Sequence, residues 1–351
     1  MPWIFADGDW WADGVEPPTR RLRWALIGAS DIAATQILPA LRRLGHEPVV
    51  VVSSDQDRAD GYAAEHGVGR GTTSVADAVA AGVDAVYVST TNDRHAAAVH
   101  TAVAAGRHVL CEKPLALTLD EAQGMVDAAA KADVVMATNH HLRNAPVHRA
   151  LRRLVADGVL GRLLAVRVSH TIDLSERLRG WRIAGTPGSG VVLDLTVHDA
   201  DTVRFVTGLE PVEVAAVGLA QGLAQGTVDA VAVAGRLTGG VSLHLHDAYT
   251  VPHAPSTFEV LGTEASALAT AAMSQPPDGD VILRRTGHAD VLVDVGEREN
   301  LYDRGLRAFA AAVGGDGQPP CTGADGVRSL AVALAVQESL ATGCRVAVPA
   351  P

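Results

Sequence analysis

The chain has 351 residues, of which 48% are hydrophobic and 20% are charged. This composition is typical of a globular protein, and the length is enough for two domains with separate cores. A formal net charge of -11 disfavours binding to phosphate backbones and to anionic lipid head groups, and no apolar run approaches the ~18 residues of a membrane span. We therefore expect a soluble protein with no nucleic-acid partner and no membrane partner.

The first twenty residues differ from the rest of the chain. They hold three of the five tryptophans, show no hydrophobic periodicity, and lack the basic start and apolar stretch of a secretory signal. We interpret residues 1–20 as an N-terminal extension. It is either a surface tail or a segment that packs through Trp3, Trp10 and Trp11 on a partner subunit or on the mouth of the substrate site. The three cysteines lack any CxxC or zinc-ligand spacing, which favours a reducing, cytoplasmic location.

From Arg21 onward, short apolar segments alternate with segments of helical periodicity. Strands are predicted within residues 22–30, 48–54, 83–90, 108–114 and 134–144, and helices within 31–45, 59–67 and 95–106. Buried strands separated by helices of about three turns require parallel pairing. The pattern predicts an α/β Rossmann domain, a doubly wound parallel sheet, over residues 21–140, with ligands at the carboxyl ends of the strands.

A turn with a single glycine follows the first predicted strand. It consists of Gly28, Ala29, Ser30, Asp31, Ile32 and Ala33. Gly28 permits a tight turn, Ser30 is small enough for the backbone to approach a pyrophosphate, and Ala33 allows close packing of helix on strand. The helix amino terminus would face the anion. A plain βα turn shares this pattern, but its place in the array favours dinucleotide binding.

The end of the second strand bears on the choice of cofactor. An acid there would bind the ribose hydroxyl of NAD, whereas small polar residues with an arginine accommodate the 2′-phosphate of NADP. The strand ends in Ser53 and Ser54, and Arg58 follows. This favours NADPH, although Asp55 and Asp57 keep NAD open as the alternative.

Lys113 stands at the end of the fourth predicted strand, between Glu112 and Pro114. A lysine there could polarise a carbonyl held against the nicotinamide, while the proline fixes the turn that aims it. A surface Glu-Lys pair is the simpler alternative, but the carboxyl end of this strand borders the expected crevice.

The second half, residues 141–351, has a different pattern. After a connecting amphipathic helix (residues 149–161), successive strands with few helices predict an α+β domain with a large, mainly antiparallel open sheet. Residues 212–218 and 231–235 are apolar on both faces, so a homo-oligomer through the open sheet face is expected.

The helical exception is residues 190–208, in which Asp194 and His198 share a face, as do His198 and Asp201. A carboxylate beside an imidazole orients the ring and holds its pKa near the working pH, which suits proton transfer. A buried structural histidine is the alternative. We expect Lys113 from the first domain and the Asp194–His198 face from the second to converge across a cleft.

The turn at residues 28–33, Glu112-Lys113-Pro114 and Asp194-x-x-x-His198, in this order, resemble the Gfo/Idh/MocA family of oxidoreductases. The resemblance implies NADPH-dependent reduction of a keto group on a sugar or polyol, or alternatively an NAD-dependent inositol or sugar dehydrogenase. In it, His198 donates the proton to the nascent alkoxide, Lys113 polarises the carbonyl and Asp194 orients the site. The substrate-binding residues that it implies are His170, Trp181 and Arg182. Besides the phosphate turn, the cofactor contacts that it implies are Ser53, Ser54, Arg58, Thr90, Thr91, Asn92, His95, Glu112, Lys113, Asn139, Trp181, Arg182 and Tyr302.

Two hypotheses that place the protein in other functional classes remain. The first is a metal hydrolase, because His140-His141, His198-Asp199 and His244-x-His246-Asp247 supply imidazole and carboxylate ligands. A Rossmann half has no role in such an enzyme, so we expect no metal. The second is a non-catalytic NAD(P)-binding regulator, which loss of Lys113 or His198 would have favoured; both are present.

Overall fold

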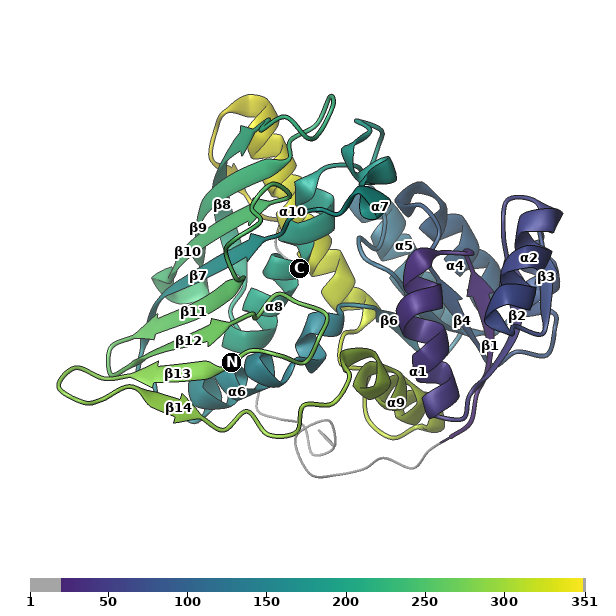
Figure 1. The fold of residues 1–351 in the computed structure, drawn as a ribbon, viewed down its shortest axis with the longest axis horizontal. Helices are drawn as coiled ribbons and strands as arrows, with labels where there is room; N and C mark the ends of the chain where they lie inside the picture. Colours follow the sequence, from purple (N-terminus) through teal and green to yellow (C-terminus); the bar gives the residue numbers. More distant parts are fainter. Residues whose placement is uncertain (1–19, 350–351) are drawn as a thin grey trace. The chain divides into compact units, whose positions relative to one another are not determined.

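A computed structural model describes residues 20–349 of the chain (Figure 1). The described residues form two compact units. The Rossmann unit comprises residues 20–141 and 302–327, and the open-sheet unit comprises residues 142–301 and 328–349. The Trp-rich extension lies outside the described residues, apart from Arg20.

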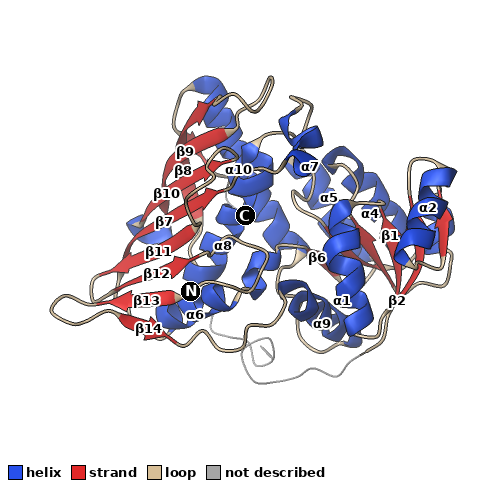
Figure 2. Cartoon of the chain, in the orientation of Figure 1, coloured by secondary structure: helices blue, strands red, loops and turns tan. Residues whose placement is uncertain are grey.

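The Rossmann unit is built on a six-stranded parallel sheet of order β3-β2-β1-β4-β5-β6, which confirms the predicted doubly wound fold. Its strands are β1 (Arg23–Ile27), β2 (Glu47–Val52), β3 (Arg70–Thr72), β4 (Ala85–Val88), β5 (His108–Cys111) and β6 (Met136–Thr138). The central strands β1 and β4 are buried and consist almost wholly of apolar residues, as expected when both faces of a sheet are covered by helices (Figure 2).

The helices of this unit follow the strands in turn. They are η1 (Ala33–Ile37), α1 (Leu38–Arg43), α2 (Gln56–His66), α3 (Val75–Val79), η2 (Asn92–Arg94), α4 (His95–Ala104), α5 (Leu119–Lys131) and most of α9 (Leu301–Gly314). The sequence pattern gave no sign of β3, a three-residue strand of sequence RGT, and α3 and α5 were also missed. The chain returns to this unit at residues 302–327, which differs from the single boundary expected after residue 140. Phe309 of α9 packs on Trp24 of β1, with ring centroids 5.3 Å apart, so an apolar contact accounts for the return.

The open-sheet unit contains nine strands in the order β14-β13-β12-β11-β7-β10-β9-β8-β15. Their bounds are β7 (Leu163–Thr171), β8 (Pro211–Leu219), β9 (Ala230–Leu237), β10 (Ser242–Ala248), β11 (Thr257–Gly262), β12 (Ser266–Thr270), β13 (Val281–Arg284), β14 (Val291–Val293) and β15 (Val346–Ala347). The pairs are antiparallel except for β7 with β10, which run parallel. The large, mainly antiparallel sheet is therefore confirmed, with β12 and β15 as strands that the sequence did not reveal.

Helices cover one face of this sheet (Figure 1). They are α6 (Pro146–Ala156), η5 (Val192–Thr196), α8 (Val197–Thr207) and the C-terminal part of α10 (Gly323–Thr342), with the short η3 (His141–Asn144), α7 (Glu176–Arg179), η4 (Gly180–Ile183) and η6 (Thr238–Gly240) in connections. On the opposite face, Val217 and Leu219 of β8 are exposed beside small alanines of β9, while β10 presents His244 and His246. This outer face is thus apolar over β8 and polar at β10.

The continuous helical segment formed by η5 and α8 is buried at every residue. It nevertheless carries Asp194, His198, Asp199 and Asp201, each no more than 5% exposed. Buried polar groups are costly unless they are hydrogen-bonded, so each of these side chains requires a partner. The segment therefore concentrates polar chemistry inside the open-sheet unit.

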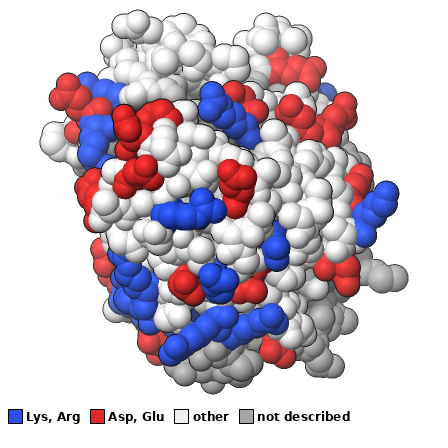
Figure 3. Space-filling view, turned by 90° about the vertical axis from the view of Figure 1, so that its right-hand side faces the viewer, with Lys and Arg blue, Asp and Glu red and all other residues white. Residues whose placement is uncertain are grey.

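Charge is not segregated on the face of the protein shown in Figure 3, where acidic and basic side chains are interspersed. Within residues 20–349, no helix is both long and apolar enough to cross a lipid bilayer.

Candidate active site

The turn after β1 lies against the end of β4. Gly28 has a φ of 122°, and a Cβ atom at this position would lie 2.7 Å from the carbonyl oxygen of Ser89. Only glycine combines this backbone conformation with so close an approach. Ser30 Oγ lies 2.8 Å from Ser89 Oγ and accepts the N–H of Ala33 at 3.2 Å. The predicted phosphate turn is therefore held to the neighbouring strand.

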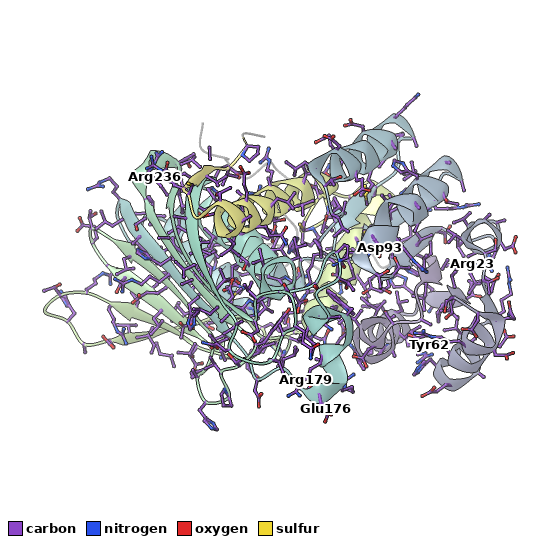
Figure 4. The ribbon with its side chains drawn as sticks, turned by 90° about the horizontal axis from the view of Figure 1, so that it is seen from above. Arg23, Tyr62, Asp93, Glu176, Arg179 and Arg236 are labelled. Carbon is purple, nitrogen blue, oxygen red and sulfur yellow. The ribbon has the colours of Figure 1, made fainter. Side chains whose placement is uncertain are left out.

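Helix α2 contributes side chains to the same turn. Arg58 Nη2 donates to the carbonyl oxygen of Ala29 at 3.1 Å, and Tyr62 Oη donates to that of Ser30 at 3.0 Å; Tyr62 is labelled in Figure 4. Asp55 caps the helix by accepting the N–H of Arg58 at 2.9 Å. The structure brings to the turn Arg58, which the sequence assigned to the 2′-phosphate of the cofactor. It adds Tyr62, which the sequence reasoning missed although it lies one helical turn after Arg58.

The loop after β4 is fixed to the turn after β5 by a buried histidine. His95 places Nε2 3.2 Å from the carbonyl oxygen of Thr90 and Nδ1 3.0 Å from that of Pro114. Burial lowers the pKa of His95, so the ring is neutral at physiological pH and offers a single N–H. His95 thus joins the loop of Thr90 to Asn92 to the Lys113–Pro114 turn, whose peptide bond is cis.

Glu112, beside Lys113, is held by two donors. Tyr87 Oη lies 2.5 Å and Asn139 Nδ2 2.6 Å from Glu112 Oε1. Burial raises the pKa of this carboxyl, and the two hydrogen bonds oppose the rise. Burial and the Glu112 charge raise the pKa of Tyr302, whose ring stacks on His141 with centroids 5.0 Å apart. The expected cofactor residues Glu112, Asn139 and Tyr302 therefore cluster, although Tyr302 is distant in sequence.

In the open-sheet unit, Asp194 receives hydrogen bonds from Arg182 Nε at 2.8 Å and from Tyr249 Oη at 3.0 Å. The Arg182 guanidinium lies over the Trp181 ring, 4.8 Å from its centroid, and donates to the carbonyl oxygen of Leu178 at 3.1 Å. Asp194, Trp181 and Arg182, which the sequence assigned to one site, are therefore joined by direct contacts. Figure 4 labels Glu176 and Arg179 on α7, the short helix just before them.

A second group of buried polar side chains is formed around His170 of β7. Its Nδ1 lies 2.8 Å from Asp199 Oδ1, and its ring centroid is 6.2 Å from that of His198. The two histidines that the sequence assigned to the site are therefore neighbours. The carboxylate that orients an imidazole is Asp199, which the sequence analysis had noted only as a possible metal ligand.

Asp201, which the sequence places on one helical face with His198, has a partner from another segment. Arg143 binds Asp201 through two parallel hydrogen bonds, with Nε 2.7 Å from Oδ2 and Nη2 2.6 Å from Oδ1, and both side chains are buried. A buried carboxylate is best stabilised by a bidentate guanidinium, and helical spacing alone does not reveal that a guanidinium is near. Asp201 is therefore part of a structural ion pair.

Thr196 was missed, and Asp247 was noted only as a possible metal ligand. Asp247 is on β10, directly beside His170 in the parallel register with β7, and it accepts a hydrogen bond from the Thr196 hydroxyl. The sequence held a signal: Leu243, Leu245 and Asp247 alternate on the buried face of the strand, so an acid occupies a core position.

The histidines of β10 face the other way. His244 and His246 are exposed on the outer face, and His244 Nε2 lies 2.8 Å from Ser242 Oγ. Within the described part of the chain, no group of three or more His, Cys, Asp or Glu side chains could hold a metal ion. All three cysteines are free thiols; Cys111 and Cys321 are buried.

The fold and these side chains define a class of protein. One unit is a doubly wound sheet with a tight turn after β1, and the other holds buried Asp and His side chains. This is the architecture of an NAD(P)-dependent oxidoreductase. Comparison with known families agrees. Residues 22–140 match the GFO/IDH/MocA oxidoreductase family with an NAD-binding Rossmann fold, and residues 148–268 match the GFO/IDH/MocA C-terminal domain. The chain belongs to this family.

Individual relatives cover nearly the whole chain. A 1,5-anhydro-D-fructose reductase of Ensifer adhaerens is 47% identical over 325 residues, which make up 92% of this chain and 97% of the relative. Among solved structures, aldose-aldose oxidoreductase from Caulobacter crescentus in complex with glycerol superposes with a TM-score of 0.84 at 23% identity, over 93% of this chain and all of that one. Levoglucosan dehydrogenase in complex with NADH and levoglucosan gives 0.83 at 22% identity, over 94% of this chain and all of that one. These two likenesses establish the fold.

Proposed function

We propose that the protein uses NADPH to reduce the keto group of a sugar-like substrate, and that this substrate is 1,5-anhydro-D-fructose, reduced to 1,5-anhydro-D-mannitol. The relative from Ensifer adhaerens supports the choice of sugar. The observation that carries the reaction type is the buried group of Asp194, His170 and His198. Reduction of a ketone needs a proton at the oxygen as well as a hydride at the carbon, and such a group can supply it.

The Rossmann unit fits an NADP-type dinucleotide. The close approach at Gly28 leaves no side chain between the turn and a pyrophosphate. Ser53 and Ser54 follow β2 where an acid would select NAD, and Asp55 is engaged in capping α2. Arg58 stands over the turn, where a guanidinium can bind a 2′-phosphate. The cofactor supplies the hydride when it is bound.

Three side chains are proposed to act on the substrate. Lys113 polarises the carbonyl, and His198 donates the proton to the developing alkoxide. Asp194, held by Arg182 and Tyr249, keeps a fixed negative charge that orients hydroxyl groups of the sugar.

Other residues are proposed to surround these groups. On the cofactor side they are Thr90, Thr91, Asn92, His95, Glu112, Asn139 and Tyr302. His170, Trp181 and Arg182 bind the sugar, and the exposed edge of Trp181 offers an apolar surface for a sugar ring. Trp181 and Arg182 are also proposed to border the cofactor.

An NAD-dependent dehydrogenase of an inositol or a sugar is the second candidate. The observation that favours it is Asp57, an exposed acid in the first turn of α2, from which a carboxylate could reach a ribose hydroxyl. It would run in the oxidative direction on an alcohol substrate.

One assay separates the two candidates. The purified chain is mixed with NADPH or NADH and with 1,5-anhydro-D-fructose, an inosose or a simple keto-sugar, and in the oxidative direction with NADP⁺ or NAD⁺ and myo-inositol or an aldose. Absorbance at 340 nm is followed in both directions. We expect the largest kcat/KM for NADPH with 1,5-anhydro-D-fructose. Turnover confined to NAD⁺ with myo-inositol or an aldose would overturn the proposal in favour of the dehydrogenase.

We also propose that a second copy of the chain covers the outer face of the nine-stranded sheet at Val217 and Leu219, which are 64% and 45% exposed. Light scattering should give the mass of a dimer, and the Val217→Lys variant should give that of a monomer. A monomeric wild-type protein would rule out this interface.

A further inference from the structure

Two buried carboxyl groups lie beside His170. Asp199 on α8 and Asp247 on β10 are both 0% exposed; Asp199 lies within hydrogen-bond distance of the His170 ring, and Asp247 is the partner of His170 in the register of β10 with β7. The two acids interact electrostatically, and a carboxylate can only accept a hydrogen bond, so two ionised groups could not bond to each other. The geometry therefore raises the question of where a proton is held.

The four oxygen atoms of the pair answer it. Asp199 Oδ1 accepts from His170 Nδ1 at 2.8 Å, and Asp247 Oδ2 accepts from the Thr196 hydroxyl. The remaining oxygens, Asp199 Oδ2 and Asp247 Oδ1, are buried and find no N–H or O–H donor within residues 20–349. A single proton between them satisfies both, whereas two adjacent buried charges would each lack solvation.

We propose that Asp199 and Asp247 share one proton, carried by Asp247, and that this bridged pair positions His170 for the reaction. Asp247 donates to the Asp199 carboxylate, which in turn receives the Nδ1–H of His170. The imidazole is thereby fixed in the Nδ1–H tautomer, with Nε2 as the other ring nitrogen. Asp199 and Asp247 are then positioning residues, and their effect on turnover rests on the proposed function.

The direction of the pKa shifts agrees with this distribution of the proton. Burial, followed by the Asp199 charge, raises the pKa of Asp247 well above its ordinary value. Burial raises the pKa of Asp199 to about 7, and its hydrogen bond with Asp247 opposes the rise. The proton therefore remains on Asp247 when Asp199 is ionised.

Few other charged groups surround Asp199 and Asp247. His170 of β7 lies beside both acids, and His198 of α8 lies beside His170. Tyr249, which follows β10, interacts electrostatically with Asp247. Tyr249 donates to Asp194 of η5, which Arg182 neutralises.

His148 of α6 also interacts electrostatically with His170. Burial lowers the pKa of His148 to about 4, so its ring is neutral at physiological pH. Arg143 is bound to Asp201, and Arg204 lies 3.8 Å from Asp201 and is bound to Glu210. The shared proton is therefore the simplest way to balance the pair.

Two isosteric variants test the proposal. In Asp247→Asn, the amide donates permanently to Asp199 and still accepts from Thr196, so the negative charge stays beside His170. In Asp199→Asn, the amide oxygen can accept the proton of a neutral Asp247, and the amide N–H then donates to His170 Nδ1, which forces the ring into the Nε2–H tautomer and leaves no charge beside it. Size is matched, and the two variants differ in the charge and in the hydrogen-bonding group presented to His170. Asp290→Asn, at an exposed site on the surface, is the control for the chemical change itself.

We expect Asp247→Asn to retain kcat within about threefold and Asp199→Asn to lower kcat by about 10²-fold, because a misplaced His170 no longer holds the sugar in the reactive orientation. The variants are then examined without substrate. In ¹⁵N NMR spectra, with the His170 signals assigned from a His170→Gln variant, Asp247→Asn should keep the Nδ1–H tautomer and Asp199→Asn should lose it. An equal loss of kcat, or an unchanged tautomer in both variants, would overturn the proposal.

Melting temperature against pH tests the shared proton itself. An acid whose pKa is raised on folding stabilises the protein at low pH, and this stability is lost as pH rises through the folded pKa. Wild type should therefore lose stability relative to Asp247→Asn as pH rises from 4 toward 8, because the amide has no proton to release. Parallel melting curves over this range would show that Asp247 holds no proton.

These measurements separate two kinds of failure. If wild type reduces none of the ketones, the proposed function is wrong, and the NMR and melting results still decide whether the proton is shared. If Asp199→Asn does not fold, the melting curves of wild type and Asp247→Asn alone decide the question.

Discussion

Replacing Arg58 by alanine gives the sharpest test of cofactor choice. If its guanidinium binds the 2′-phosphate of NADPH, the variant loses a charge-assisted hydrogen bond worth about 1.5–3 kcal/mol. Arg58 is exposed to solvent, so the lower end applies. We expect the Kd of NADPH to rise about tenfold, or roughly 1.4 kcal/mol. The Kd of NADH should remain near that of wild type, because NADH has no 2′-phosphate.

The competing account is also visible in the structure. Arg58 donates to the carbonyl oxygen of Ala29, so its loss could instead loosen the phosphate turn. That role is common to both dinucleotides and predicts equal weakening of NADPH and NADH. Fluorescence titration of wild type and Arg58→Ala with each dinucleotide distinguishes the two accounts. Arg70→Ala, an exposed arginine at the start of β3, serves as the control. Equal affinities of wild type for NADPH and NADH would refute the assignment of Arg58.

Three further predictions concern catalysis, stability and metals. His198→Ala should lower kcat by about 10² to 10⁴ with NADPH affinity near wild type, and Lys113→Ala should do likewise; a stable His198→Ala variant with full turnover would remove this residue from the mechanism. Arg143→Met should lower the free energy of unfolding in urea by about 3 kcal/mol, because it leaves the buried Asp201 carboxylate without its bidentate partner. A loss under about 1 kcal/mol would contradict this account of the ion pair. Activity should survive extensive treatment with EDTA, and a loss restored by zinc would revive the hydrolase interpretation.

Much of the fold follows from local patterns in the sequence. Continuous apolar segments such as residues 23–27 and 85–88 form buried strands because helices cover both faces of a parallel sheet. The turn at Gly28 was recognisable because it needs a glycine between strand and helix. The three-residue strand β3 was invisible, since its sequence RGT has no apolar periodicity and its pairing with β2 alone defines it. The return of residues 302–327 to the Rossmann unit likewise depends on packing, of which the contact between Phe309 and Trp24 is one part.

The candidate site likewise shows features that the sequence predicts and features that only tertiary packing determines. The sequence by itself determined which residues are candidates for the chemistry: Lys113 after a Rossmann strand, and Asp194 and His198 on one helical segment. Tertiary structure alone decided their partners. His170 lies against Asp199, Asp201 is bound by Arg143, and Asp247 lies beside His170 because β7 and β10 run parallel in one register. The physical reason is that helical spacing fixes only neighbours within a segment. A buried charge is neutralised by whichever donor the packing of distant segments places beside it.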